Sequence, residues 1–338
     1  MKQLRRSNTF ALALLIFGSI GLPSQTQEAA NCYDANGQPT RCEHLEQSFS
    51  FGQIPRVNST CGTPSHSFCF RTVSLGIISN NCTGVCDASD PSNAHPPNLM
   101  TDSSNESWWQ SENSLDPQTS VMIELSLGTM VEISFIALKF RSLKPSAFYI
   151  EKSTDAGANY QPFHYFSTSC NEQYMIEPDA TLGFNNETAA LCQPIDIPPE
   201  PGLIRFVPTT RRPSANDSIP GFSENLYSFL TASDIRIILD EHFIIDNLEA
   251  DDPGYYYAIE DLNVIGSCQC HGHASTCAIN PQTGQYQCAC QHNTTGNFCE
   301  QCREFYYDVP WQRADGNEPF ECKCKTNMFS WCVYSTPF

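Results

Sequence analysis

The sequence has few positively charged residues for its size. Its 338 residues contain 18 Lys and Arg against 37 Asp and Glu, a formal net charge of -19. Nucleic-acid binding relies on Lys and Arg that displace the counterions of phosphates, so this charge balance disfavours it. We expect partners that are neutral, basic or cationic.

Catalytic motifs are also missing. The sequence contains no G-x-S-x-G, no H-E-x-x-H, no Gly-rich phosphate loop and no lone cysteine beside a histidine. Neighbouring carboxylates occur at Asp251-Asp252 and Glu260-Asp261, but such pairs are common in acidic loops and do not by themselves make a general acid and base. We expect no enzyme and no catalytic cofactor.

Long apolar runs are absent beyond the N-terminus. Lys2, Arg5 and Arg6 precede an apolar run at residues 10–22, and small or polar residues follow it. This order is typical of a cleaved signal peptide, here residues 1–30, and the run is shorter than the roughly 20 residues that cross a bilayer. The sequence therefore predicts a secreted, extracellular protein without a membrane span.

Cysteine, in contrast, is abundant. The 18 cysteines accompany 23 prolines, a combination that indicates a disulfide framework in an oxidising compartment. Asn-x-Ser/Thr acceptors for N-glycosylation support the same route. They lie at Asn58, Asn81, Asn105, Asn186, Asn216 and Asn293.

The cysteines divide the chain into two regions. Eight lie between residues 32 and 265 and ten between residues 268 and 332, so the boundary falls near Gly266. A jump in cysteine density marks a change from a packed core to covalent cross-links. We assign a head to residues 31–267, a disulfide-rich module to 268–322 and an atypical tail to 323–338.

The head has the pattern of an all-β domain. Apolar residues alternate over residues 121–127 and again over 131–137, and Gly128-Thr129 between them suggests the turn of an antiparallel hairpin. Further short alternating runs are separated by Pro, Gly, Asn and Ser, and helical periodicity is nowhere sustained. This pattern favours a β-sandwich.

The second region resembles a laminin-type EGF-like repeat. The resemblance is carried by Cys268-Gln-Cys270-His-Gly-His-Ala-Ser-Thr-Cys277, by the run from Cys288 to Cys302, and by Phe305-Tyr-Tyr-Asp308. Spacing alone leaves 105 pairings of eight cysteines open. The resemblance implies Cys268 with Cys277, Cys270 with Cys288, Cys290 with Cys299, and Cys302 with Cys322.

The head is similar to the laminin N-terminal domain of laminins and netrins, which implies a jelly-roll-like β-sandwich. The matching segments include Cys61-Gly-Thr-Pro, Cys86-Asp-Ala-Ser-Asp-Pro-Ser-Asn-Ala-His-Pro-Pro, Trp108-Trp-Gln-Ser-Glu-Asn113 and Tyr255-Tyr-Tyr-Ala-Ile259. The second and third look most like netrins, whereas the run from Cys32 to Cys42 suits netrins and laminin γ chains alike.

Two features depart from the netrin pattern. Many netrins carry an extra disulfide whose cysteines would align with Trp108 and Arg141, and this sequence has neither. After Cys322, a second repeat starts at Cys324 without the expected pattern. Cys324 and Cys332 either pair with each other or belong to a truncated second repeat.

The resemblance also implies a structural calcium ion. From the sequence alone, Asp102 is a turn or capping carboxylate on a polar loop. In laminins and netrins an Asp at this position binds Ca2+, which takes carboxylate and carbonyl oxygens. By the resemblance the other ligands are Leu99, Ser107 and Glu260, largely through backbone oxygens.

Three other groups have competing interpretations. Residues 268–277 contain zinc-ligand types, but their spacing and an oxidising compartment favour disulfides, with His271 and His273 as turn residues around Gly272. Adjacent strand residues face opposite ways, so we expect one of Trp108 and Trp109 in the core and the other exposed or under a loop. For the basic doublet Arg211-Arg212, a surface salt bridge is favoured over contact with a sulfated glycan or an acidic partner.

The resemblance implies one of two functions, both through protein–protein contacts. The first is a secreted netrin-like ligand or matrix glycoprotein of cell or axon guidance, migration and adhesion, with netrin-type receptors as partners. The alternative is a laminin-type short-arm head that takes part in, or caps, basement-membrane network assembly by contacting other laminin N-terminal heads.

Overall fold

The computed structural model describes residues 32–324, except for 44, 179, 216–222, 247, 249–250 and 317. The predicted signal peptide, the sequon at Asn216 and the cysteine at position 332 lie outside the described residues. Cys324 is disulfide-bonded.

The head holds most of the regular structure. Its strands are β1 (Gln47–Ser48), β2 (Arg56–Val57), β3 (His66–Ser74), β4 (Ile77–Cys86), β5 (Trp109–Gln110), β6 (Val121–Phe140), β7 (Ala147–Ser153), β8 (Gln161–Ser167), β9 (Leu191–Pro194), β10 (Gly202–Phe206), β11 (Thr231–Glu241) and β12 (Ala258–Cys268). Its helical segments are η1 (Pro97–Met100), α2 (Cys170–Tyr174), η2 (Pro213–Ala215) and α3 (Glu224–Leu230). The module holds β13 (Cys277–Ile279), β14 (Tyr286–Cys288), β15 (Thr294–Thr295) and β16 (Gln301–Cys302).

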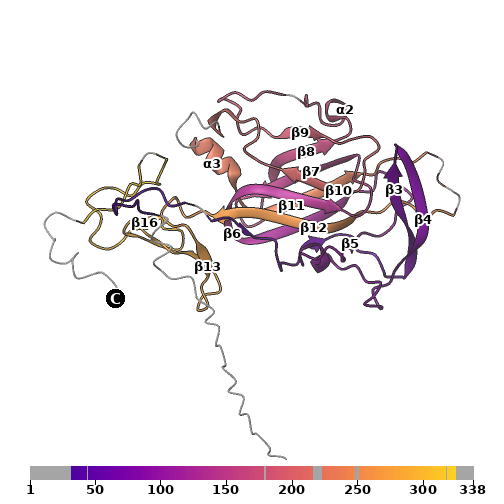
Figure 1. The fold of residues 1–338 in the computed structure, drawn as a ribbon, viewed down its shortest axis with the longest axis horizontal. Helices are drawn as coiled ribbons and strands as arrows, with labels where there is room; N and C mark the ends of the chain where they lie inside the picture. Colours follow the sequence, from indigo (N-terminus) through magenta and orange to yellow (C-terminus); the bar gives the residue numbers. More distant parts are fainter. Residues whose placement is uncertain are drawn as a thin grey trace, which may run out of the picture.

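Strand β6 belongs to both layers of the head (Figure 1). Its first half is hydrogen-bonded to β2 and β11, and its second half to β10 and β12. From β11 the sheet continues through β7 and β8 to β9. The predicted hairpin at Gly128 is therefore wrong: the chain does not reverse there but changes neighbours. Gly128 has φ +72°, a backbone conformation that glycine adopts both in a bend within one strand and in a hairpin turn. The alternation of apolar residues on its two sides could therefore not distinguish a bent strand from a hairpin.

The two layers meet through aromatic side chains. The ring centroids of Phe163 in β8 and Phe206 in β10 are 4.9 Å apart, and those of Phe140 in β6 and Phe148 in β7 are 5.6 Å apart. Neither pair joins strands that are hydrogen-bonded to each other. These contacts across the interior confirm the predicted β-sandwich, and each fully buried Phe contributes about 1.5–3 kcal/mol through the hydrophobic effect.

Eight disulfides fall within the described residues. The structure joins the four pairs of the module that the family resemblance implies and four further pairs in the head. The pairs are Cys268–Cys277, Cys270–Cys288, Cys290–Cys299, Cys302–Cys322, Cys32–Cys42, Cys61–Cys86, Cys69–Cys82 and Cys170–Cys192.

The head and the module share one core. Strand β12 ends at Cys268, and Cys270 and Cys288 of the module belong to the same buried cluster as the sandwich interior. The N-terminal segment also crosses between them: Cys42 N–H donates to Gly272 O (3.1 Å) and Leu45 N–H to Ser275 O (3.1 Å), after which β1 pairs with β12. The module is thus held at one end of the head, and the β3–β4 hairpin lies at the other (Figure 1).

Candidate functional site

The calcium ligand predicted on the loop after η1, Asp102, is exposed and its carboxylate organises that loop. One oxygen accepts the N–H of Ser104 (2.8 Å) and the other accepts the hydroxyl of Ser107 (2.7 Å). Ser103 between them has φ +58°, so the loop bends sharply around the carboxylate. Each oxygen keeps lone-pair capacity beyond these bonds.

Glu260 comes from β12, where the pairing with β6 is irregular. The register shifts between Ile259 and Asp261, so Glu260 is the extra residue of a β-bulge and stands outside the regular ladder. Its carboxylate binds the ammonium group of Lys139 (2.6 Å). The side chain is therefore engaged, whereas its backbone lies outside the register of paired residues.

Charged side chains of the loop after η1 and of β12 lie close enough to affect one another. Burial raises the pKa of Asp261; Lys139 lowers it, and the nearby carboxylates of Asp102 and Glu260 raise it again. Leu99 lies in η1, which packs against β12. Sequence reasoning noted Asp261 only as a neighbour of Glu260 and did not place it at this site, because the bulge that brings it toward Asp102 has no clear sequence signal. A carboxylate and backbone carbonyls are donor types that suit Ca2+, while the Glu260 carboxylate itself is occupied by the ammonium group of Lys139.

An aromatic stack lies beside this loop. The rings of His95 and Trp108 are stacked 4.1 Å apart, and the guanidinium of Arg141 lies 5.0 Å over the Trp108 ring. Burial lowers the pKa of His95 to about 4, with a further contribution from the charge of Arg141. Trp109 is fully buried and donates to Thr60 Oγ1 (3.2 Å). The expectation of one core tryptophan and one under a loop is confirmed.

The aromatic stack includes the two positions at which this sequence lacks the cysteines of many netrins. Trp108 and Arg141 are the positions at which many netrins carry the cysteines of an extra disulfide. In this chain the two side chains are in contact, so a cation–π interaction joins the same two segments without a covalent bond.

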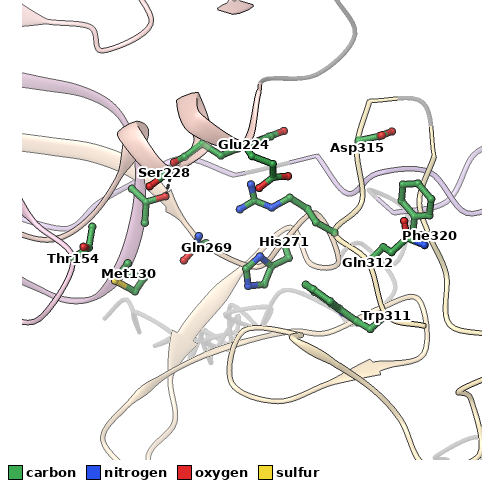
Figure 2. Close-up of a pocket in the computed structure, with 13 residues that line it drawn as sticks. Met130, Thr154, Glu224, Ser228, Gln269, His271, Trp311, Gln312, Asp315 and Phe320 are labelled. Carbon is green, nitrogen blue, oxygen red and sulfur yellow. Dashed lines mark hydrogen bonds between the residues drawn. The ribbon is translucent and has the colours of Figure 1, made fainter. Parts of the chain in front are cut away.

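A hollow of about 710 Å³ lies at the junction of head and module. Figure 2 shows Glu224 and Ser228 on the α3 side and His271 and Trp311 on the module side. Between them Arg313 of the module pairs with Glu132 of β6 (3.3 Å). Burial raises the pKa of Glu132, and the charge of Arg313 lowers it in part. The junction is thus fastened by a partly desolvated ion pair.

Two histidines beside the module cysteines contact each other, and one of them contacts the N-terminal segment. The Nδ1 atoms of His273 and His292 are 3.0 Å apart, and His292 Nε2 lies 3.1 Å from Cys32 O. The three cysteines of residues 268–277 are all in disulfides, so they offer no thiolate to zinc. His271 and Gly272 have φ +55° and +74°, as turn residues do. His273, however, is fully buried, which the turn interpretation missed.

The basic doublet differs from its prediction. Arg212 is 5% exposed and donates to the backbone carbonyl oxygens of Pro208, Glu187 and Ala189 instead of forming a surface salt bridge. Its guanidinium also lies 3.8 Å over the Phe229 ring. The interpretation as a surface salt bridge is wrong for Arg212, because the side chain ties two loops together inside the head.

The sequons differ in how they present the side-chain amide nitrogen that takes the glycan. Asn58, Asn81, Asn105 and Asn186 are exposed. Asn293 is partly buried, and its Nδ2 donates to Cys322 O (3.0 Å) and to Glu321 Oε1 (3.2 Å). In the folded chain this nitrogen is engaged, so glycosylation at Asn293 would have to precede closure of the Cys302–Cys322 loop.

Both regions match known protein families. Residues 45–266 match the laminin N-terminal domain (domain VI) and residues 268–315 match the laminin/attractin EGF domain. The chain belongs to the laminin N-terminal domain family. As such, it is a secreted protein of the extracellular matrix.

Curated relatives of this laminin-type chain include γ subunits. Human laminin subunit gamma-3 is 36% identical over 307 residues, covering 86% of this chain and 19% of the relative. Human laminin subunit gamma-1 is 35% identical over 326 residues, covering 90% of this chain and 20% of the relative. The chain thus spans about a fifth of the length of these relatives.

Some solved structures have a distant likeness to this chain. One is chitosan-binding module 1 of a chitosanase/glucanase from Paenibacillus sp. IK-5, with 13% identity and a TM-score of 0.33, covering 66% of this chain and 100% of that chain. Within the residues that the structure describes, no helix has the length and apolarity to cross a membrane.

Proposed function

We propose that this chain is a laminin-γ-type head that works by contacting other laminin N-terminal heads in a basement-membrane network. The observation that supports this proposal is the core that head and module share. The similarity to laminin γ chains, which extends over both regions, supports it as well. A head that is fixed on its first repeat presents its loops in one orientation, which lowers the ordering cost of association. This function is not catalytic.

A structural calcium ion is part of the proposal. The carboxylate of Asp102 and backbone oxygens of Leu99, Ser107 and Glu260 would hold it, with Asp261 nearby. Bound there, the ion would tie the loop after η1 to β12 and neutralise the converging carboxylates.

The second candidate is a netrin-like ligand of guidance, migration and adhesion. The netrin-like runs of the sequence favour it, and they form the aromatic stack of His95 and Trp108. The contact of Trp108 with Arg141 in place of the netrin disulfide favours the laminin-type head instead.

Binding of the purified secreted chain to two panels tests the choice. The panels are laminin N-terminal fragments and netrin-type receptor ectodomains, each with calcium and with a chelator. We expect binding to laminin heads that is lost on chelation. Binding to receptor ectodomains alone would replace the proposal by the netrin-like one, and binding to neither would overturn both.

Two matched variants test the calcium ligand. Asp102→Asn removes the charge but keeps the turn, and Asp87→Asn does the same in a similar exposed turn, where Asp87 Oδ1 accepts Ser89 N–H (2.9 Å). We expect calcium to raise the melting temperature of the Asp87→Asn variant and the parent chain but not that of Asp102→Asn. Equal responses of the three proteins would remove Asp102 from the site.

A further inference from the structure

Two buried histidines of the module, His273 and His292, face each other beside the N-terminal segment; we call them the histidine pair. Both residues are fully buried, and their Nδ1 atoms are 3.0 Å apart. His273 Nε2 lies 2.9 Å from Gln312 O, and His292 Nε2 lies 3.1 Å from Cys32 O. All four ring nitrogens are therefore within hydrogen-bond distance of a partner.

These contacts need more protons than two neutral rings carry. A backbone carbonyl oxygen only accepts hydrogen bonds, so each Nε2 has to donate its N–H to the carbonyl oxygen that it faces. A neutral imidazole has one N–H, which leaves both Nδ1 atoms without a proton and directs two lone pairs at each other over 3.0 Å. The three contacts thus require three protons, whereas two neutral rings supply two.

Other tautomers and ring orientations do not remove this shortage. If one ring carries its proton on Nδ1, its Nε2 has none and directs a lone pair at a carbonyl oxygen. If one ring is turned over, carbon atoms take the places of both its nitrogens, and two buried hydrogen bonds are lost. A third proton, held between the two Nδ1 atoms, satisfies every contact.

The surroundings of the pair determine what this extra charge costs. Burial lowers the pKa of both rings, to about 4 for His273, whereas the carbonyl oxygens that face the rings raise it. The carboxylate of Glu321 also raises the pKa of His292. A charge that is shared by two rings, with every N–H bonded, costs less to bury than a charge on one ring. The pair then titrates as a unit, with a pKa that belongs to neither ring alone.

The other titratable neighbours of the pair add little charge. Burial lowers the pKa of His271 to about 4, so this ring is neutral at pH 7. Burial raises the pKa of Tyr33, whose ring meets that of His292 edge-on at 5.5 Å, so the phenol is neutral too. Arg303, whose charge acts on Tyr33, donates to Thr294 O (3.1 Å).

We propose that the histidine pair binds one additional proton between its Nδ1 atoms at neutral pH and that this proton holds the N-terminal segment on the module. When the proton is lost, either the Nδ1 contact or a contact with a carbonyl oxygen becomes repulsive, so the attachment of Cys32 weakens as pH rises. His292 has φ +53°, an uncommon conformation for a residue other than glycine, and this backbone places the ring between its two partners. The proposal does not depend on contact between laminin heads.

Nitrogen NMR of the intact secreted chain, with 15N-labelled histidine, counts these protons. At pH 7 we expect protons on three of the four ring nitrogens of the pair and a scalar coupling between the two Nδ1 atoms across their hydrogen bond. Two protons on the pair at pH 7 would overturn the proposal. Metal analysis of the same sample gives a second check, because one bound zinc or copper ion between the Nδ1 atoms would satisfy both lone pairs and would overturn the proposal as well.

Two matched variants test what the proton stabilises. His292→Gln replaces one ring of the pair, and His271→Gln replaces a ring outside it, each by a polar side chain that takes up no proton. Both residues have a positive φ, +53° and +55°, so the backbone cost of the two substitutions is similar. The difference between the variants therefore reports the loss of the pair.

The pH dependence of urea unfolding is the readout. In the proposal the pKa of the folded pair lies above the ordinary value near 6.5, so its stability is fully present below that value and is lost as pH rises through the folded pKa. Between pH 6.5 and 8.5 the unfolding constant of the parent chain and of His271→Gln should rise by up to about tenfold per pH unit more than that of His292→Gln. Equal pH dependence of the three proteins would overturn the proposal. The proton count needs no variant, so it decides the proposal even where His292→Gln does not fold.

Discussion

The head and the module keep their shape by different means. The head encloses a core in which Trp109, Phe148 and Phe163 are fully buried, and its longest strand has 20 residues. The strands of the module have two or three residues, and four disulfides cross its 55-residue span. Large surface burial is available only to a long enough chain, so the short module depends on covalent cross-links.

The comparison also shows how two such regions act as one body. Cysteines of the module join the core cluster of the sandwich, and Cys32, Cys42 and Leu45 of the N-terminal segment are hydrogen-bonded to the module before the chain enters the head. The ion pair of Arg313 with Glu132 adds a polar fastening at the same junction. Because the head is fixed to the module, any partner that binds the loops of the head is held in a fixed orientation relative to the module.

The largest expected effect is a cavity in the head. Phe148→Ala removes a fully buried ring that stacks on Phe166 at 4.4 Å. Truncation of a buried Phe to Ala costs about 3–5 kcal/mol, and we expect that loss in the free energy of unfolding by urea. The control Leu203→Ala, on a side chain that is 62% exposed in β10, should change it by less than about 0.5 kcal/mol. A loss below about 1 kcal/mol for Phe148→Ala would contradict a packed core.

The next effect separates the two sources of stability. We compare loss of Cys290–Cys299 in the module with loss of Cys69–Cys82 across the β3–β4 hairpin, each by paired Cys→Ser changes. The first should cost about 2–4 kcal/mol, and protease should cut the module. The second should cost less, because the ladder of β3 and β4 holds the hairpin without its bridge. Equal losses and equal cleavage would contradict the distinction between a packed and a cross-linked region.

Much of the architecture could be predicted from local pattern. Alternation predicted the sandwich, cysteine density predicted the cross-linked module, and the resemblance implied four pairings that the structure contains. The bend at Gly128 could not be predicted, because a period of two is the same in a hairpin and in one long strand.

The sites depend on contacts that no local pattern encodes. The register shift that places Glu260 in a bulge, and the burial of Arg212 against carbonyl oxygens, follow from tertiary packing. The contact of Trp108 with Arg141 joins residues 33 positions apart and appears only in the fold. Asp102, whose turn bonds are local, is the exception: sequence reasoning expected a turn carboxylate, and its oxygens accept bonds from Ser104 and Ser107.

Acid should act on the head through its buried histidines. Burial lowers the pKa of His242, stacked on Tyr257 at 3.7 Å, to about 3, and that of His95 to about 4. Each folded pKa lies below the ordinary value near 6.5, so the stability is fully present above that value and is lost as pH falls toward the folded values. We expect a loss of about 2 kcal/mol per histidine by pH 5.

Melting temperatures between pH 7.5 and 5 measure this loss. His242→Gln should flatten the pH dependence, because the substituted side chain takes up no proton on unfolding. The same change at His66 in β3, a half-buried histidine, serves as the comparison variant. A pH dependence that is unchanged in His242→Gln would show that other groups control acid unfolding.

The smallest effect concerns the contact that replaces a netrin-type bridge. Trp108→Leu and Arg141→Gln, combined in a double-mutant cycle, should give a coupling energy of about 0.5–2 kcal/mol in urea unfolding, as cation–π contacts do. A coupling near zero would mean that the two side chains are neighbours without mutual stabilisation. The double variant with Trp108→Cys and Arg141→Cys tests whether a disulfide can replace this contact. If the disulfide forms and restores the stability that is lost when the aromatic stack is removed, packing and cross-linking are interchangeable at this position of the head.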